Sequence, residues 1–93
     1  MATSTNAATT KDKFCSQMYD LAEILMKARQ NGLPIKKTLE LVQNLDNKQM
    51  TVIAESYVEE AYREPRFSTK INKQEAINRF AEKSYFECKD ILK

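Results

Sequence analysis

Histidine is absent from this 93-residue sequence, and glycine and cysteine are scarce. Histidine is the commonest general base and metal ligand in proteins, so its absence excludes histidine-dependent triads and histidine-containing zinc sites. A single glycine cannot build a glycine-rich phosphate loop, and two cysteines cannot make a four-cysteine zinc site. We therefore expect no enzymatic activity, no catalytic residues, no metal and no cofactor.

The shortage of glycine and proline also predicts the fold class. The chain has one glycine and two prolines, the residues that helix interiors avoid, whereas a β-protein of this size needs several glycines for its turns. Hydrophobic residues make up 42% and charged residues 30%, which is typical of a folded globular protein. The length suits one domain. These features predict a single all-α domain.

Neither a strong charge nor a long apolar run is present. Fifteen Lys or Arg face thirteen Asp or Glu, giving a net charge of +2, so the chain has no global field for nucleic acid or an anionic membrane. No apolar run approaches the roughly 20 residues that span a bilayer. We expect the partner to be another protein rather than nucleic acid or a membrane.

Residues 1–10, "MATSTNAATT", are small and mostly polar, and we expect a disordered tail before a helical domain at 11–93. They lack the 7–15-residue apolar core of a secretory signal peptide. Two explanations remain: a cytosolic protein, or a mature exported chain given a new initiator Met.

Apolar periodicity predicts a compact bundle of four helices near 11–31, 35–45, 48–63 and 73–92. Thr10 is the expected N-cap of the first helix, and Gly32 supplies the left-handed residue that ends it. One face of this helix carries Phe14, Met18, Leu21, Leu25 and Ala28.

Two sequence signals predict where later helices begin. Asp46 with Gln49, and Asn72 with Glu75, have the spacing of capping boxes. Pro65 ends the third helix, because the residue before a proline is disfavoured in helical conformation. The most regular apolar stripe, in the last helix, is Ala76, Ile77, Phe80, Ala81, Ser84, Tyr85, Cys88, Ile91 and Leu92.

Cys15 lies at the start of the first helix and Cys88 near the end of the last. Antiparallel packing of these helices would bring the two cysteines to one end of the bundle, which favours a disulfide. The alternative is two separate buried thiols, which cysteine tolerates well. A bridge would indicate a periplasmic or secreted protein, and reduced thiols a cytoplasmic one.

The stretch between the third and fourth helices combines aromatic and cationic side chains. One interpretation has the two aromatics closing the end of the core, with the arginines solvated or stacked on them. The other is a basic edge that binds an acidic protein, a glycan or a phosphate backbone. The candidate binding residues are Tyr62, Arg63, Arg66, Phe67, Lys70 and Lys73.

Four short motifs resemble a loose group of small exported helical proteins of bacteria and phages, most of them uncharacterised. The motifs are an early helical cysteine, Arg29-Gln-Asn-Gly32, Ala61-Tyr62-x-x-Pro65-Arg66, and a cysteine closing the last helix. The similarity spans most of residues 15–88 and departs at the N-terminus, where no signal peptide is present. The resemblance implies a periplasmic or secreted location and a Cys15–Cys88 bridge, but no activity.

Three functions remain open from the sequence. The first is an extracytoplasmic binding or inhibitor domain acting through a surface at residues 62–73. The second is a cytosolic phage or accessory protein that binds a host protein or nucleic acid with both thiols reduced. The third is a structural role, such as a homodimer stabilised by spare apolar faces.

Overall fold

Four helices make up the described part of the chain. The computed structural model describes residues 6–92, with side chains from residue 10 onward. The helices are α1 (Asn6–Gln30), α2 (Ile35–Gln43), α3 (Lys48–Arg63) and α4 (Lys70–Ile91). No strand occurs within residues 6–92, and the predicted all-α fold of four helices is confirmed.

Helix α1 begins earlier than predicted. Residues 6–10, expected in the disordered tail, are helical, so Thr10 lies inside α1 and is not its N-cap. The stretch contains no glycine or proline, and its alanines are strong helix formers. The rest of the predicted tail, residues 1–5, lies outside the described residues.

Gly32 ends α1 as predicted. Its φ is +85°, and the Leu33 and Gly32 amides donate to the carbonyls of Ala28 and Arg29, both at 3.0 Å. These two bonds form a Schellman motif, in which a left-handed glycine satisfies the last helical carbonyls. The guanidinium of Arg66 would lie 2.7 Å from a Cβ added at Gly32, but it is the end of a flexible side chain and could shift, so the positive φ is what requires glycine here.

The two predicted capping boxes are wrong by one and three residues. Asn47, not Asp46, caps α3, and its Oδ1 accepts from the amides of Gln49 and Met50 at 2.8 and 3.2 Å. Thr69, not Asn72, caps α4, and its Oγ1 accepts from the Asn72 amide at 3.1 Å. Asn47 and Thr69 both have extended backbone, which is the conformation that an N-cap needs, so each caps its helix in place of the predicted residue.

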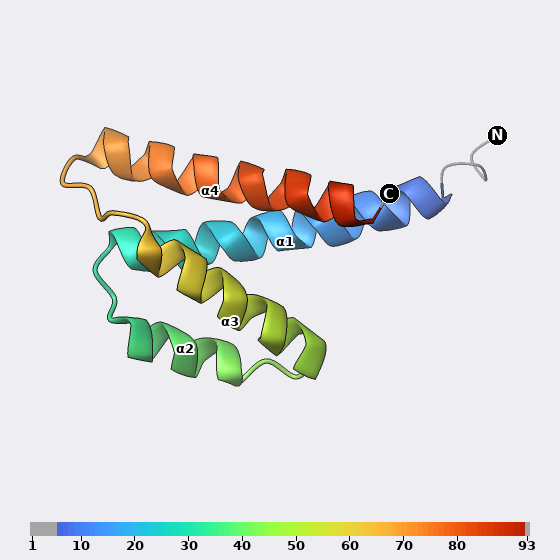
Figure 1. Cartoon of the computed structure of the whole chain (residues 1–93), viewed down its shortest axis with the longest axis horizontal. Coiled ribbons are helices and arrows are strands. Elements are labelled where there is room, and N and C mark those ends of the chain that lie inside the picture. Colours follow the sequence, from blue (N-terminus) through green and yellow to red (C-terminus); the bar gives the residue numbers. More distant parts are fainter. Residues whose placement is uncertain (1–5, 93) are drawn as a thin grey trace.

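The helices spread into a flat arrangement. Helix α4 runs antiparallel beside α1, while α2 and α3 form a hairpin that packs on the C-terminal part of α1 and diverges from it (Figure 1). The molecule measures 49 × 30 × 17 Å, and its radius of gyration is 14.5 Å. Met50 and Ile53, near the start of α3, nevertheless pack on the cluster formed by Cys15, Met18 and Cys88.

The core follows the predicted stripes of α1 and α4 with one clear exception. Phe80 of α4 and Met26 of α1 centre one buried cluster, and Cys15, Met18 and Cys88 form another at the N-terminal end of α1. Ile91, predicted in the core, is 81% exposed. The helical periodicity is correct there, since the adjacent Leu92 packs on the cluster of Cys15, Met18 and Cys88, but most of the Ile91 side chain faces water.

Candidate functional site

Gln30 organises the segment that connects α3 to α4. Its side chain is completely buried. Its Nε2 donates to the carbonyl of Pro65 at 2.8 Å, and its Oε1 accepts from the amide of Phe67 at 2.8 Å. Sequence analysis missed this residue, although Ala22, Met26 and Gln30 recur every four positions on one face of α1. The sequence signal for this residue was a polar side chain at the same helical spacing as two apolar residues.

Two of the four predicted basic residues in this segment bind the end of α1. Arg66 Nε and Lys73 Nζ donate to the carbonyl of Gln30 at 3.1 and 2.6 Å. Cations at a helix C-terminus are stabilised by the helix dipole and satisfy free carbonyls. Arg63 and Lys70 are exposed. The predicted basic edge is therefore divided between two residues that cap α1 and two on the surface.

The two predicted aromatic residues are half-buried. The Tyr62 hydroxyl donates to the Leu33 carbonyl at 2.6 Å, which leaves Thr38 to donate to the Tyr62 oxygen at 2.7 Å. The Arg29 guanidinium lies 5.4 Å from the centroid of the Tyr62 ring. These contacts agree with the interpretation that the segment closes the end of the core. Binding by residues 62–73 stays a prediction.

Cys15 of α1 and Cys88 of α4 lie side by side, so the pair connects the first helix to the last. Their Cα atoms are 5.6 Å apart and their Sγ atoms are at disulfide distance, across a sequence separation of 73 residues. Both side chains are buried, and an ion pair beside them joins Asp12, one turn before Cys15 on α1, to Lys89, the residue after Cys88 on α4. The antiparallel pairing that the sequence predicted is confirmed.

An apolar groove opens beside this cysteine pair, where α3 diverges from α4. Its volume is about 390 Å³, within the usual range of about 300–1,000 Å³ for ligand sites. Met18 and Cys88 are buried, whereas Val52 and Ile91 are 66% and 81% exposed. We call this feature the apolar groove; its apolar lining includes Phe14 and Met18 of α1, Val52, Ile53 and Tyr57 of α3, and Ile91 and Leu92 of α4.

The charged residues that line the apolar groove within the described part of the chain are Glu60 and Glu87, both acidic. Burial raises the pKa of the Tyr57 hydroxyl above its ordinary value of 10.0. A hydrogen bond with Ser84 opposes this rise, while Glu60 and Glu87 raise the pKa of Tyr57 further. The carboxylates of Glu60 and Glu87 therefore influence the ionisation of Tyr57, which lines the groove. Sequence analysis did not predict this site.

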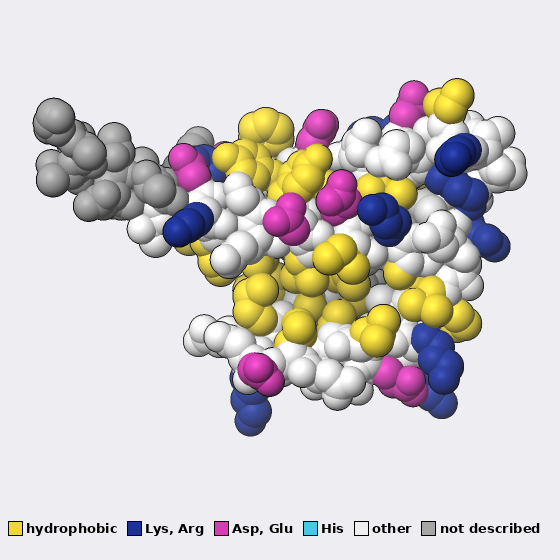
Figure 2. Space-filling view, turned by 180° about the vertical axis from the view of Figure 1, so that it is seen from behind, with side chains coloured by type: hydrophobic (Ala, Val, Ile, Leu, Met, Phe, Trp, Pro, Cys, Tyr) yellow, Lys and Arg dark blue, Asp and Glu magenta, His cyan; other side chains and the backbone are white. Residues whose placement is uncertain are grey.

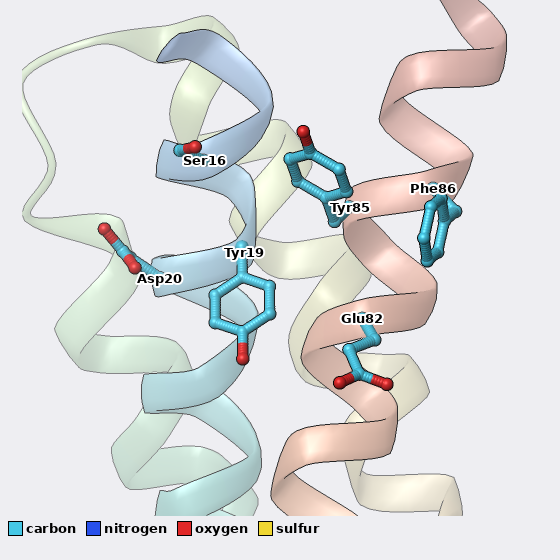
Figure 3. Close-up of a pocket in the computed structure, with 6 residues that line it drawn as sticks. All are labelled: Ser16, Tyr19, Asp20, Glu82, Tyr85 and Phe86. Carbon is cyan, nitrogen blue, oxygen red and sulfur yellow. The ribbon is translucent and has the colours of Figure 1, made fainter. Parts of the chain in front are cut away.

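A second cleft lies between α1 and α4 and does not involve α3. It has a volume of about 320 Å³ and is lined by Ser16, Tyr19, Asp20, Glu82, Tyr85 and Phe86. Tyr19 and Tyr85 lie between the two helices, while Asp20 and Phe86 lie at its flanks (Figure 3). The rings of Tyr85 and Phe86 meet edge to face at 5.6 Å. The two acids of this cleft are on its exposed rim.

Large hydrophobic side chains remain exposed on every helix. On the face shown in Figure 2, hydrophobic side chains form a band between the α1/α4 pair and α2, with acidic side chains above it. Soluble monomers expose few contiguous apolar patches, so such surfaces often contact a partner. The exposed large hydrophobics are Ile24, Ile35, Leu41, Leu45, Val52, Ile71, Phe86 and Ile91.

The described residues contain no group of three or more Cys, Asp or Glu side chains placed to hold a metal ion. Among residues 6–92 no helix has the length and apolarity to cross a membrane. Comparison with protein-family models, curated proteins and solved structures finds no match to this chain.

Proposed function

We propose that this chain is a small, non-enzymatic protein-binding domain that acts through the apolar groove. The observation that carries the proposal is a concave site with a buried floor and exposed apolar rims at Val52 and Ile91. An apolar centre with a polar edge is the usual composition of a protein-binding surface.

The groove supports binding better than the basic segment at residues 62–73. Arg66 and Lys73 already donate to the Gln30 carbonyl, so a partner would have to compete with the C-terminus of α1 for them. Val52 and Ile91 have no comparable role, because most of each side chain is exposed to water. Their exposure is easier to explain by a partner than by folding.

We further propose that the domain works in an oxidising compartment, in the periplasm or outside the cell. The support is the Cys15–Cys88 pair, since structural disulfides persist mainly in such compartments. A cytosolic accessory protein with two reduced thiols is the competing proposal. It would place the same thiols, reduced, at the same buried position.

Capture with matched baits tests the proposed surface. Wild-type protein and the double variant Val52→Gln/Ile91→Gln would be used to retain proteins from extracts of the source cells and from their medium. Both positions are mostly exposed, so the variant should keep its helix content and melting temperature. We expect a partner retained by wild type and lost with the variant. Equal retention by both baits would show that the groove is not the binding surface.

A further inference from the structure

We propose that the occupant of the apolar groove is an amphipathic helix of another protein with Lys or Arg beside its apolar residues. This inference rests on the proposed function, because it names the partner chemistry of the same groove. Two properties of the groove support it, its length and the sign of its charges.

The dimensions of the groove suit a helix. The α3 side runs from Val52 to Glu60, nine residues whose first and last Cα atoms are separated along the helix by about 12 Å at 1.5 Å per residue. That length matches about two turns of a partner helix, enough for apolar side chains at positions i, i+3, i+4 and i+7. Three helices form the walls and floor, and the buried Met18 and Cys88 form an apolar base.

The charges select a basic partner. Glu60 lies on the α3 wall and Glu87 on the α4 wall, and no Lys or Arg of residues 6–92 lines the groove. An apolar helix flanked by Lys or Arg would place positive charge against both walls, while a helix flanked by Asp or Glu would be repelled. The same carboxylates disfavour nucleic acid and anionic lipid, whose phosphates carry negative charge.

The charges also argue against a second copy of this chain. A twofold dimer would place the same surface of each copy against the other. Glu60 and Glu87 of both copies would then meet in one interface with no cation from the groove lining of residues 6–92 to balance them. A separate basic helix avoids this repulsion.

Selection from a peptide library tests the inference directly. The library would display amphipathic helices with apolar residues at i, i+3, i+4 and i+7 and with Lys, Glu or Gln randomised at the flanking positions. Clones that bind the oxidised wild-type protein would be counter-selected against Val52→Gln/Ile91→Gln, which removes the apolar rims. We expect the enriched groove-dependent clones to carry Lys at the flanking positions.

A matched pair of charge variants completes the test. Glu60→Gln/Glu87→Gln should weaken a selected peptide about fivefold to tenfold at low salt, as expected for two partly exposed ion pairs. Glu59→Gln/Glu82→Gln removes the same charge from exposed positions of the same two helices outside the groove lining and should leave the affinity within twofold. High salt should remove the difference between wild type and the first variant.

The outcomes separate the two proposals. Groove-dependent clones with Glu or Gln at the flanking positions would overturn the basic partner but keep the groove as the binding surface. A wild-type dimer that Val52→Gln/Ile91→Gln dissociates would make a second copy the occupant and also overturn the basic partner. An absence of groove-dependent clones would overturn both the inference and the proposed function.

Discussion

A single buried amide, Gln30, joins the end of α1 to the segment between α3 and α4. Its side chain binds the backbone at Pro65 and Phe67, and its own carbonyl accepts from Arg66 and Lys73. Position 30 was not among the residues predicted on the buried face of α1, although it follows Ala22 and Met26 at a spacing of four residues. Its role was not predictable, because its partners are 35 or more residues away and meet it only after α3 has packed.

We predict that Gln30→Ala lowers the free energy of unfolding by about 2–3 kcal/mol, because it leaves the Phe67 amide and the Pro65 carbonyl without partners. Urea unfolding followed by circular dichroism measures the loss. Gln17→Ala is the control, since Gln17 is exposed on the same helix and should change stability by less than about 0.5 kcal/mol. Equal values for the two variants would contradict the role given to Gln30.

Tyr57 gives a prediction about alkaline pH. Burial, with Glu60 and Glu87, raises the pKa of Tyr57 above 10.0 in the folded protein, while the unfolded chain keeps the ordinary value. Above pH 10 the unfolded chain therefore loses this proton first, which favours unfolding. The contribution of Tyr57 to stability is complete below pH 10 and is lost as pH rises through the raised pKa.

Wild type should consequently lose more stability between pH 8 and pH 11 than Tyr57→Phe does. Lysine titration is common to both proteins, so the difference between their urea midpoints at the two pH values isolates the hydroxyl. The phenolate titration of folded wild type should also contain, relative to that of Tyr57→Phe, one additional transition with a pKa above 10.0. Parallel pH profiles of wild type and Tyr57→Phe would exclude the raised pKa.

At the scale of helices, the sequence predicted the elements well and their ends less well. The bounds of α3 were predicted correctly, because Pro65 limits its extension at the C-terminal end. Helix α2 ends at Gln43, two residues before the predicted end, and α4 begins at Lys70, three residues before the predicted start. Asp46 and Asn47 are adjacent and both can form an N-cap, so local propensity does not decide which of them caps the helix. The path of the chain, which is set by packing, decides it.

The basic segment offers a prediction about α1. Arg66→Gln/Lys73→Gln should lower the free energy of unfolding by about 1.5–3 kcal/mol, because both cations donate to the Gln30 carbonyl at the end of the helix. Arg63→Gln/Lys70→Gln removes the same charge from exposed positions of the same segment and should stay within about 0.5 kcal/mol of wild type.

Thermal and urea unfolding of the two double variants at equal salt checks this prediction. A similar loss for both would show that net charge, rather than the capping of α1, sets the stability of the segment. Any partner affinity lost in Arg63→Gln/Lys70→Gln, with stability unchanged, would instead restore residues 62–73 as a binding surface.

At the scale of the whole molecule, the flat arrangement explains why the candidate site escaped prediction. An apolar stripe in the sequence predicts that one face of a helix is buried, but it does not show which other helix covers that face. Val52 and Ile91 look like ordinary members of helical sequences, and they are exposed because α3 diverges from α4 (Figure 1). The antiparallel α1/α4 pair was predictable, since the two cysteines lie at opposite ends of the chain and the helices are long. The angle of the α2–α3 hairpin depends on side-chain packing between stripes.

The Cys15–Cys88 pair is also important for the stability of the whole molecule. A disulfide between these cysteines closes a loop of about 74 residues, and loop-closure entropy gives it about 4 kcal/mol. A domain of this size has few other stabilising contributions of that magnitude. Reduction, or Cys15→Ala/Cys88→Ala, should therefore lower the melting temperature by roughly 15–30 °C. Helix content at low temperature should stay near native, because the apolar stripes still direct α1 against α4.

Circular dichroism melts of oxidised, reduced and cysteine-free protein measure this effect, and the last two should agree. Alkylation of the thiols inside source cells before lysis, followed by mass spectrometry, tests whether the bond forms in the natural compartment. A fully oxidised monomer supports action outside the cytosol. Two alkylated cysteines in the native protein would favour the cytosolic accessory protein, while the apolar groove, whose walls come from three helices, would keep its proposed partner.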